Sequence, residues 1–259
     1  MDIDEYVAAK RTVRLPQGDV AYAEFGEGPA ALFVHGVFLN GLLWRKAIDG
    51  LRSERRCIAI DLPAHGDTHA DLGEGFSLEA HAALLADFLD EIGIDAIDLI
   101  GNDTGGAICQ VFAVRFPARV RTLTLTNCDV DQNFPPEAFT PSIELAQQGE
   151  LAPVLAQLAT DIELARSDVG FGVGYQHSEA LTEEVVDSFL GRYADPEAGR
   201  EIERRVAAVA GEDLSVITPQ MRALTIPTLV VWGTNDQFFA LDWAYWLRDN
   251  VPGVTKVVE

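Results

Sequence analysis

Short apolar segments alternate along the chain with amphipathic helical segments, and this alternation limits the possible folds more than any other feature. The predicted strands are residues 31–34, 57–60, 97–100, 120–126 and 228–232, and the predicted helices are 41–51, 77–92 and 104–116. Upstream, residues 12–15 and 20–24 flank the turn Pro16-Gln17-Gly18, which predicts a hairpin. Strands alternating with helices indicate a mostly parallel sheet covered on both faces.

The alternation is interrupted between Pro135 and Ala223, where helical patterns occur without a convincing strand pattern. Residues 181–193 and 197–210 are the clearest helices of this stretch. We therefore predict a core of residues 1–134 and 224–259, with residues 135–223 as a helical insertion. The final residues, 254–259, read as the start of a further strand.

The stretch 99-LIGNDTGGAICQ-110 predicts a sharp corner between a strand and a helix. Gly101, Gly105 and Gly106 surround Asp103, and a sharp corner leaves room only for small neighbours. The tip residue of such a corner has a strained backbone, and the helix N-terminus adds positive potential beside it. Asp103 is therefore a candidate reactive group. A simple N-cap of the helix is the alternative role.

Several motifs of the predicted core resemble α/β-hydrolases, in particular the group that contains haloalkane dehalogenases and epoxide hydrolases. Besides the corner, they are 33-FVHG-36, 43-LWR-45, 61-DLPAHGDT-68, 115-RFPARVRTLTLTN-127 and 230-VVWGTNDQFF-239. The resemblance covers nearly the whole core, and the helical insertion stands where that family has its cap domain. It implies an α/β-hydrolase fold with an inserted helical cap. The chain has no GxSxG sequence, which disfavours a serine esterase.

By this resemblance, Asp103 is the nucleophile of a hydrolase that acts on small, mostly apolar substrates. Its carboxylate would attack an sp³ carbon and form a covalent ester. The backbone N–H groups of Thr104 and Val37 would hold the oxyanion formed during ester hydrolysis. His35 and Gly36 belong to the same oxyanion loop by resemblance.

The resemblance also places Asp236 where the family has the carboxylate that orients a catalytic histidine. A turn aspartate is the alternative interpretation of Asp236. Asp129 follows another predicted strand and is the second candidate for the orienting acid.

Two features of the sequence concern the leaving group of the substrate. Typical dehalogenases hold the halide with a tryptophan after the nucleophile and an asparagine after the His-Gly pair, where this chain has Thr104 and Val37. Epoxide hydrolases of the group protonate the epoxide oxygen with cap tyrosines, for which Tyr175 and Tyr193 are candidates. The residues expected to line the site are Phe38, Leu39, Trp44, Phe134, Phe171, Tyr175 and Phe238.

None of the five histidines stands where the resemblance requires the catalytic histidine, after the final strand. They are His35, His65, His69, His81 and His177. Either the sequence ends before that histidine, or hydrolysis of the ester has been lost. The alternative function is thus a hydrolase-fold protein without hydrolytic turnover, either a ligand-binding module or a non-hydrolytic enzyme.

Charge and composition limit the partners. The chain has 41 acidic and 19 basic residues, and a net charge of −22 argues against nucleic acid or an anionic membrane. The N-terminus has no signal-peptide pattern, and Cys57, Cys109 and Cys128 fit neither a zinc site nor a disulfide framework. We expect a cytoplasmic monomer or homodimer that binds a small-molecule substrate without a metal or cofactor. The segment 129-DVDQN-133 opens like a calcium loop but lacks its glycine and glutamate.

Overall fold

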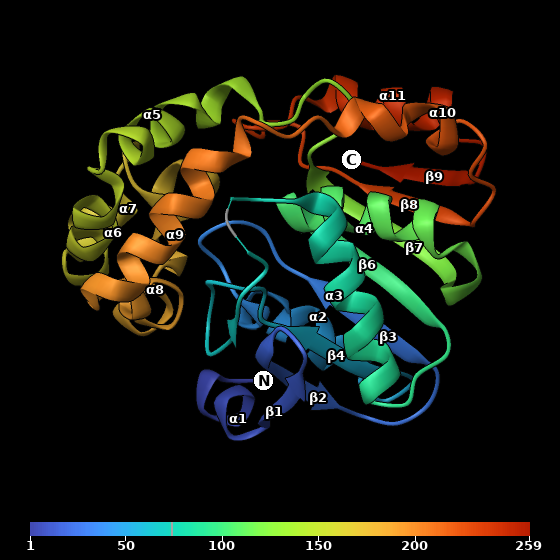
Figure 1. The fold of residues 1–259 in the computed structure, drawn as a ribbon, viewed down its shortest axis with the longest axis horizontal. Helices are drawn as coiled ribbons and strands as arrows, with labels where there is room; N and C mark the ends of the chain where they lie inside the picture. Colours follow the sequence, from blue (N-terminus) through green and yellow to red (C-terminus); the bar gives the residue numbers. More distant parts are fainter. Residues whose placement is uncertain (74) are drawn as a thin grey trace.

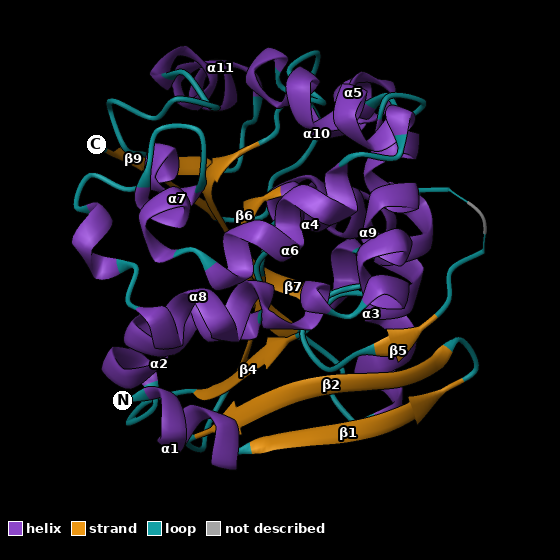
Figure 2. Ribbon diagram, turned by 90° about the vertical axis from the view of Figure 1, so that its left-hand side faces the viewer, coloured by secondary structure: helices purple, strands orange, loops and turns teal. Residues whose placement is uncertain are grey.

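A mostly parallel sheet runs through the computed structural model, which describes residues 1–73 and 75–259 (Figures 1 and 2). Its order is β1-β2-β4-β3-β6-β7-β8-β9, and β5 pairs with β2. The strands are β1 (Lys10–Leu15), β2 (Gly18–Phe25), β3 (Ala30–Val34), β4 (Arg56–Ile60), β5 (His69–Ala70), β6 (Ile97–Asp103), β7 (Val120–Cys128), β8 (Thr228–Val231) and β9 (Val254–Val258).

Strand directions confirm the predicted hairpin and the mostly parallel sheet. β1 and β2 are antiparallel, as are β2 and β4, whereas every neighbouring pair from β4 to β9 is parallel. The carboxyl ends of β3, β6, β7 and β8 therefore meet at one edge of the sheet. Ligand sites in open α/β sheets lie outside these ends.

Helices cover the sheet and also form a separate group beside it. They are α1 (Ile3–Ala8), α2 (Arg45–Leu51), α3 (Leu78–Glu91), α4 (Thr104–Arg115), α5 (Thr140–Gln148), α6 (Leu151–Thr160), α7 (Ile162–Arg166), α8 (Glu183–Leu190), α9 (Pro196–Val209), α10 (Thr218–Met221) and α11 (Leu241–Asn250). No helix within the described ranges is both long and apolar enough to cross a membrane.

The predicted helix α3 shows why the sequence pattern was informative. Ser77 caps its N-terminus by accepting a hydrogen bond from the N–H of Ala80. Its apolar face, which includes Leu85 and Phe88, is fully buried and packs against α4 and the sheet. The helix ends before Gly93, which has a φ of 69°.

Helices α5 to α9 gather at one side of the sheet, at the left of Figure 1, and we call them the helical segment. No strand is found between β7 and β8 among the described residues. One hydrophobic cluster joins side chains of this segment, such as Leu155 and Val206, to Phe33 of β3 and Ala59 of β4. The segment thus packs tightly on the rest of the chain, and its standing as a separate cap domain stays a prediction.

Candidate functional site

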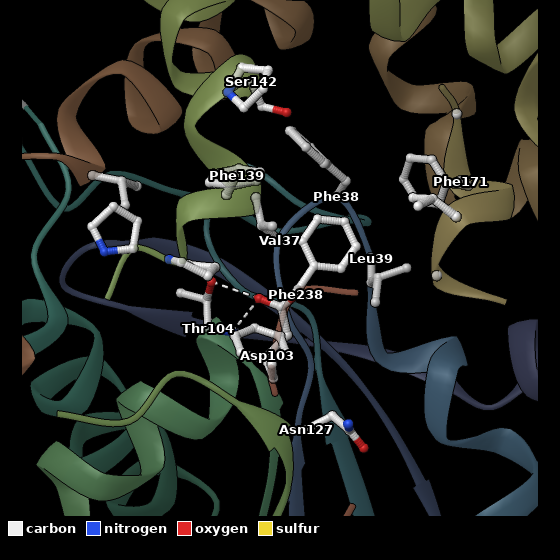
Figure 3. A pocket seen from close by; sticks show the side chains of 18 of the residues that line it. Val37, Phe38, Leu39, Asp103, Thr104, Asn127, Phe139, Ser142, Phe171 and Phe238 are labelled. Carbon is white, nitrogen blue, oxygen red and sulfur yellow. Dashed lines mark hydrogen bonds between the residues drawn. The ribbon is translucent and has the colours of Figure 1, made fainter. Parts of the chain in front are cut away.

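Asp103 is the last residue of β6 and stands at a sharp corner before α4. Its φ of 56° and ψ of −136° are unusual for a residue with a side chain, so the surrounding structure must hold it there. One carboxylate oxygen, Oδ1, accepts hydrogen bonds from the N–H of Thr104 and, at 2.8 Å, from its hydroxyl (Figure 3). The structure thus contains the predicted strand-to-helix corner.

Glycines make this corner possible by close packing. A Cβ atom added to Gly36 would lie 2.3 Å from Cβ of Asp103, and one added to Gly105 would lie 2.3 Å from the carbonyl oxygen of His35. At Gly106 an added Cβ would lie 2.3 Å from Cβ of Cys128. Real Cβ atoms do not approach this closely, so any larger residue would push the corner apart.

The half-buried carboxyl group of Asp103 has a pKa raised to about 6. Burial is the main cause, and the negative charge of Asp236 adds to it. Hydrogen bonds from the backbone and hydroxyl of Thr104 lower the pKa, as does the backbone N–H of Val37. Asp103 is therefore mainly ionised at neutral pH, with donors of Thr104 and Val37 directed at it.

Two buried histidines hold the loop that carries Val37. His35 donates through Nδ1 to the carbonyl of Gly36 (2.7 Å) and accepts the N–H of Leu62 at Nε2 (2.9 Å). His65 accepts the N–H of Phe38 at Nε2 (3.1 Å). Burial lowers the pKa of His35 to about 4 and that of His65 well below its usual value, which keeps both rings neutral and able to accept.

A cavity of about 560 Å³ lies above Asp103, between the sheet edge and the helical segment. Its walls are mostly apolar, and Figure 3 shows Phe238 beside Asp103 and Phe38, Phe139 and Phe171 farther around the cavity. The residues expected at the site that line this cavity are Val37, Phe38, Leu39, Asp103, Thr104, Asp129, Phe134, Phe171, Tyr175, Asp236 and Phe238.

Other expected residues lie elsewhere. Trp44 does not line the cavity, contrary to the expectation, because its ring is buried against Phe33 with a centroid distance of 5.5 Å. Tyr193 is also buried outside it, and its hydroxyl donates to the carbonyl of Ala64 (3.2 Å). Of the two candidate cap tyrosines, only Tyr175 faces the cavity.

Both candidate acids line the cavity, but their hydrogen bonding differs. Oδ1 of Asp236 accepts the backbone N–H groups of Phe238 and Phe239, each at 2.8 Å. This is the turn geometry of the alternative interpretation, and it also fixes the side chain beside the cavity. Asp129 is 1% exposed, and neither of its carboxylate oxygens has a hydrogen-bond partner among the described residues. Burial, with a contribution from Asp103, raises its pKa well above the usual value.

No histidine is among the described residues that line this cavity. His69 and His177 lie exposed at the surface, and His81 is buried in α3 with Nδ1 donating to the carbonyl of Ser77 (2.6 Å).

Sequence reasoning missed three polar residues of the cavity, Ser142 of α5 and two asparagines, Asn102 and Asn127, at the sheet edge. The signal for the asparagines was available, because each stands near the carboxyl end of a predicted strand. The amide nitrogen of Asn102 donates to the carbonyl of Thr126 (3.0 Å). The amide oxygen of Asn127 accepts the N–H of Gly233 (2.8 Å). The two amides thus tie neighbouring strand ends together.

Known proteins share this architecture. A component of an acetoin-cleaving system from Cupriavidus necator, a dihydrolipoyllysine-residue acetyltransferase, is 29% identical over 91% of this chain, which spans 64% of that protein's length. Haloalkane dehalogenase 2 of Mycobacterium bovis is 26% identical, covering 86% of this chain and 77% of the relative. The crystal structure of a bacterial membrane phospholipase A matches with a TM-score of 0.77 at 21% identity, over 98% of this chain and 80% of that one.

The activities named in these relatives differ, so the similarity establishes architecture and not one reaction. The family described as alpha/beta hydrolase fold matches residues 29–259, which include the sheet from β3 onward, the corner and the helical segment. The chain therefore belongs to the α/β-hydrolase fold family.

Proposed function

We propose that the protein is a hydrolase that acts on small, mostly apolar substrates through a covalent ester on Asp103. The observation that carries the proposal is the carboxylate itself. It stands at a strained corner, receives donors of Thr104 and Val37, and opens onto an apolar cavity of about 560 Å³. A carboxylate needs no deprotonation before it attacks a carbon, and apolar walls suit an apolar substrate. The dehalogenase relative supports chemistry of this kind.

The proposed reaction begins with attack by the carboxylate oxygen that Thr104 does not hold. This oxygen bonds to an sp³ carbon of the substrate, and the bond from that carbon to its leaving group breaks. The oxygen bound by Thr104 then becomes the carbonyl oxygen of the ester. When water attacks the ester carbon, negative charge returns to the same oxygen, to which Thr104 donates, with the N–H of Val37 facing the same carboxyl group.

Leaving groups with oxygen suit the cavity better than halides do. The hydroxyl of Thr104 is already engaged by Asp103, Val37 has an apolar side chain, and the amide nitrogen of Asn102 is bound to the β7 end. A halide that leaves in an apolar cavity without donors is unfavourable. The phenol of Tyr175 lines the cavity and can donate a proton to an epoxide oxygen. Epoxides are therefore the substrate class we propose first.

Hydrolysis of the ester requires a base for the attacking water. Asp236 and Asp129 both line the cavity, so either can orient a base or accept a proton near the ester. Both oxygens of Asp129 lack a hydrogen-bond partner among the described residues, but burial raises its pKa and favours the neutral acid, whereas Asp236 already accepts two backbone donors. With no histidine lining the cavity among the described residues, we expect ester hydrolysis to be the slower half of the reaction.

Intact-mass spectrometry after incubation with small epoxides and alkyl bromides tests the proposal. We expect a mass increase equal to the opened epoxide, or to the alkyl group of the bromide, mapped by peptide sequencing to Asp103. Asp103→Asn is the control and should remain unmodified. Turnover accompanied by this adduct supports a hydrolase, and an adduct that never turns over supports the non-hydrolytic alternative. A folded protein with neither adduct nor turnover would refute Asp103 as a nucleophile for these substrates.

A further inference from the structure

Arg192 and Tyr193, two consecutive residues of the helical segment, hold a loop of the sheet edge, and Tyr193 does so through the carbonyl of Ala64. Arg192 lies in the short 3₁₀ helix η6 (Gly191–Ala194), and its Nη1 donates to the carbonyls of Gly66 and Thr68, each at 2.8 Å. The same nitrogen lies 3.4 Å from the carbonyl oxygen of His65. Nη2 pairs with Glu201 of α9 at 3.1 Å, and only 14% of the arginine side chain is exposed. A guanidinium with this many fixed partners is rigidly placed.

The clamped loop, residues 64–68, is linked by one hydrogen bond to the turn that carries the donor facing Asp103. His65 lies in the loop and accepts the N–H of Phe38 at 3.1 Å. Phe38 has a φ of 61°, a conformation that costs free energy unless its surroundings hold it. Val37 is the preceding residue, and its N–H is the donor directed at Asp103. The hydrogen bond from Phe38 to His65 therefore helps to fix the direction of the Val37 donor.

We propose that Arg192 is a positioning residue that couples the placement of the helical segment to the Val37 donor of the oxyanion loop. Arg192 does not line the main cavity and acts only through the 64–68 loop. When the arginine is removed, the loop carbonyls lose their shared donor, and His65 loses its fixed position. The strained turn at Phe38 then relaxes, and the N–H of Val37 turns away from the carboxylate.

The pKa of Asp103 reports this change. The charged or hydrogen-bonding groups that face its carboxyl group are Asp129, Asp236, Thr104 and the N–H of Val37. None of the first three touches Arg192 in the described structure. Since the Val37 donor lowers the pKa of Asp103, its loss must raise that pKa above about 6.

Arg166, the last residue of α7, provides a matched control on the same segment. Its Nε donates to the carbonyl of Leu181 at 2.8 Å, and its Nη1 lies 3.9 Å from Glu163. It is thus also an arginine of the helical segment with carbonyl and carboxylate partners. These partners lie within the helical segment itself, and among the described residues Arg166 lines no pocket with Val37 or His65.

The test is a pH titration of Asp103 by carboxyl ¹³C NMR in aspartate-labelled protein, with Asp103→Asn to assign the signal. For Arg192→Ala we expect the midpoint to rise by roughly 0.5 pH unit or more, because one donor to the carboxylate is lost. We expect Arg166→Ala to keep the wild-type midpoint. An unchanged midpoint in Arg192→Ala, or an equal rise in Arg166→Ala, would overturn the coupling.

Arg192→Lys covers the case in which Arg192→Ala does not fold. A lysine keeps the charge, but its single ammonium cannot hold the loop carbonyls and Glu201 from the separate positions of two guanidinium nitrogens, so we expect a smaller rise of the midpoint. No rise in a folded Arg192→Lys variant then refutes the inference.

The kinetic part rests on the proposed function. Hydrolysis of the ester in Arg192→Ala, followed as decay of the covalent adduct, should slow about tenfold with little change in KM, because negative charge returns to the carboxylate when water attacks while the cavity walls are unaltered. The titration needs no substrate, so the two hypotheses fail separately. A raised midpoint with no ester in the wild type contradicts only the proposed function. Ester formation with an unchanged midpoint contradicts only the role of Arg192.

Discussion

Replacing Asp103 by asparagine should stabilise the protein at neutral pH while it abolishes ester formation. The folded state raises the pKa of this carboxyl group from 3.8 to about 6. This difference corresponds to at most ~3 kcal/mol of unfolding free energy. Because the side chain is only half-buried, solvent screening reduces the expected gain to about 1–2 kcal/mol. Asparagine carries no charge, so the folded state no longer holds an ionised group in an unfavourable place.

The sign of the pH dependence follows from proton binding. Between pH 3.8 and about 6, folded Asp103 binds more protons than unfolded Asp103, so its contribution to stability falls as pH rises through this window. Below pH 3.8 both states are protonated and the penalty vanishes. The stability difference between Asp103→Asn and the wild type should therefore grow from pH 4 to pH 7 and stay constant above it.

Urea unfolding of both proteins at pH 4.5, 5.5, 6.5 and 7.5, followed by tryptophan fluorescence, measures this difference. Other titrating groups are common to both proteins and cancel in the comparison. A difference that is the same at all four values would show that Asp103 has an ordinary pKa. The electrostatic description of the corner would then be wrong, even if the adduct experiment succeeded.

Three further results are expected. Gly36→Ala should lower the rate of ester formation at least ~100-fold, measured by intact mass, because its Cβ would displace the Asp103 side chain; a rate near that of the wild type would contradict the packing. The contribution of His35 to stability should fall as pH drops from about 6.5 to 4, since folded His35 has a pKa of about 4 and unfolded histidine binds the proton first; the wild type should therefore lose stability relative to His35→Gln over this range in urea unfolding. Tyr175→Phe should slow ester formation from epoxides but not from alkyl bromides, whereas Tyr193→Phe, which frees the Ala64 carbonyl, should affect epoxides and bromides equally and cost about 1 kcal/mol of stability.

Periodicity predicted most of the fold because the buried strands and α3 carry strong local patterns. Helix α11 was missed, since only Ala244 and Leu247 of it are buried and its apolar face is narrow. The two-residue strand β5 was also missed, because it exists only through its pairing with β2. Local sequence is a weak guide wherever tertiary contacts define the element.

Some features of the candidate site were also predictable from local sequence, and others were not. The Asp103 corner was predictable because a sharp turn demands small neighbours that are visible in the sequence. The position of Trp44 was not, since the short 3₁₀ helix η1 (Gly41–Trp44) turns it toward Phe33. The hydrogen bond between His65 and Phe38 joins residues 27 positions apart, so no local sequence pattern predicts it. Arg192 and the carbonyl of Gly66 that it binds are more than 120 residues apart in sequence, so this contact is visible only in the folded structure.

The crowding around Gly36, Gly105 and Gly106 has a consequence for how such a protein can diversify. At these positions an added Cβ would clash, so almost every replacement should disrupt the corner. The aromatic and aliphatic walls supplied by the helical segment are less constrained, because similar apolar side chains can replace one another with small losses. New substrates can therefore be acquired by changing the walls while the reactive corner is inherited unchanged.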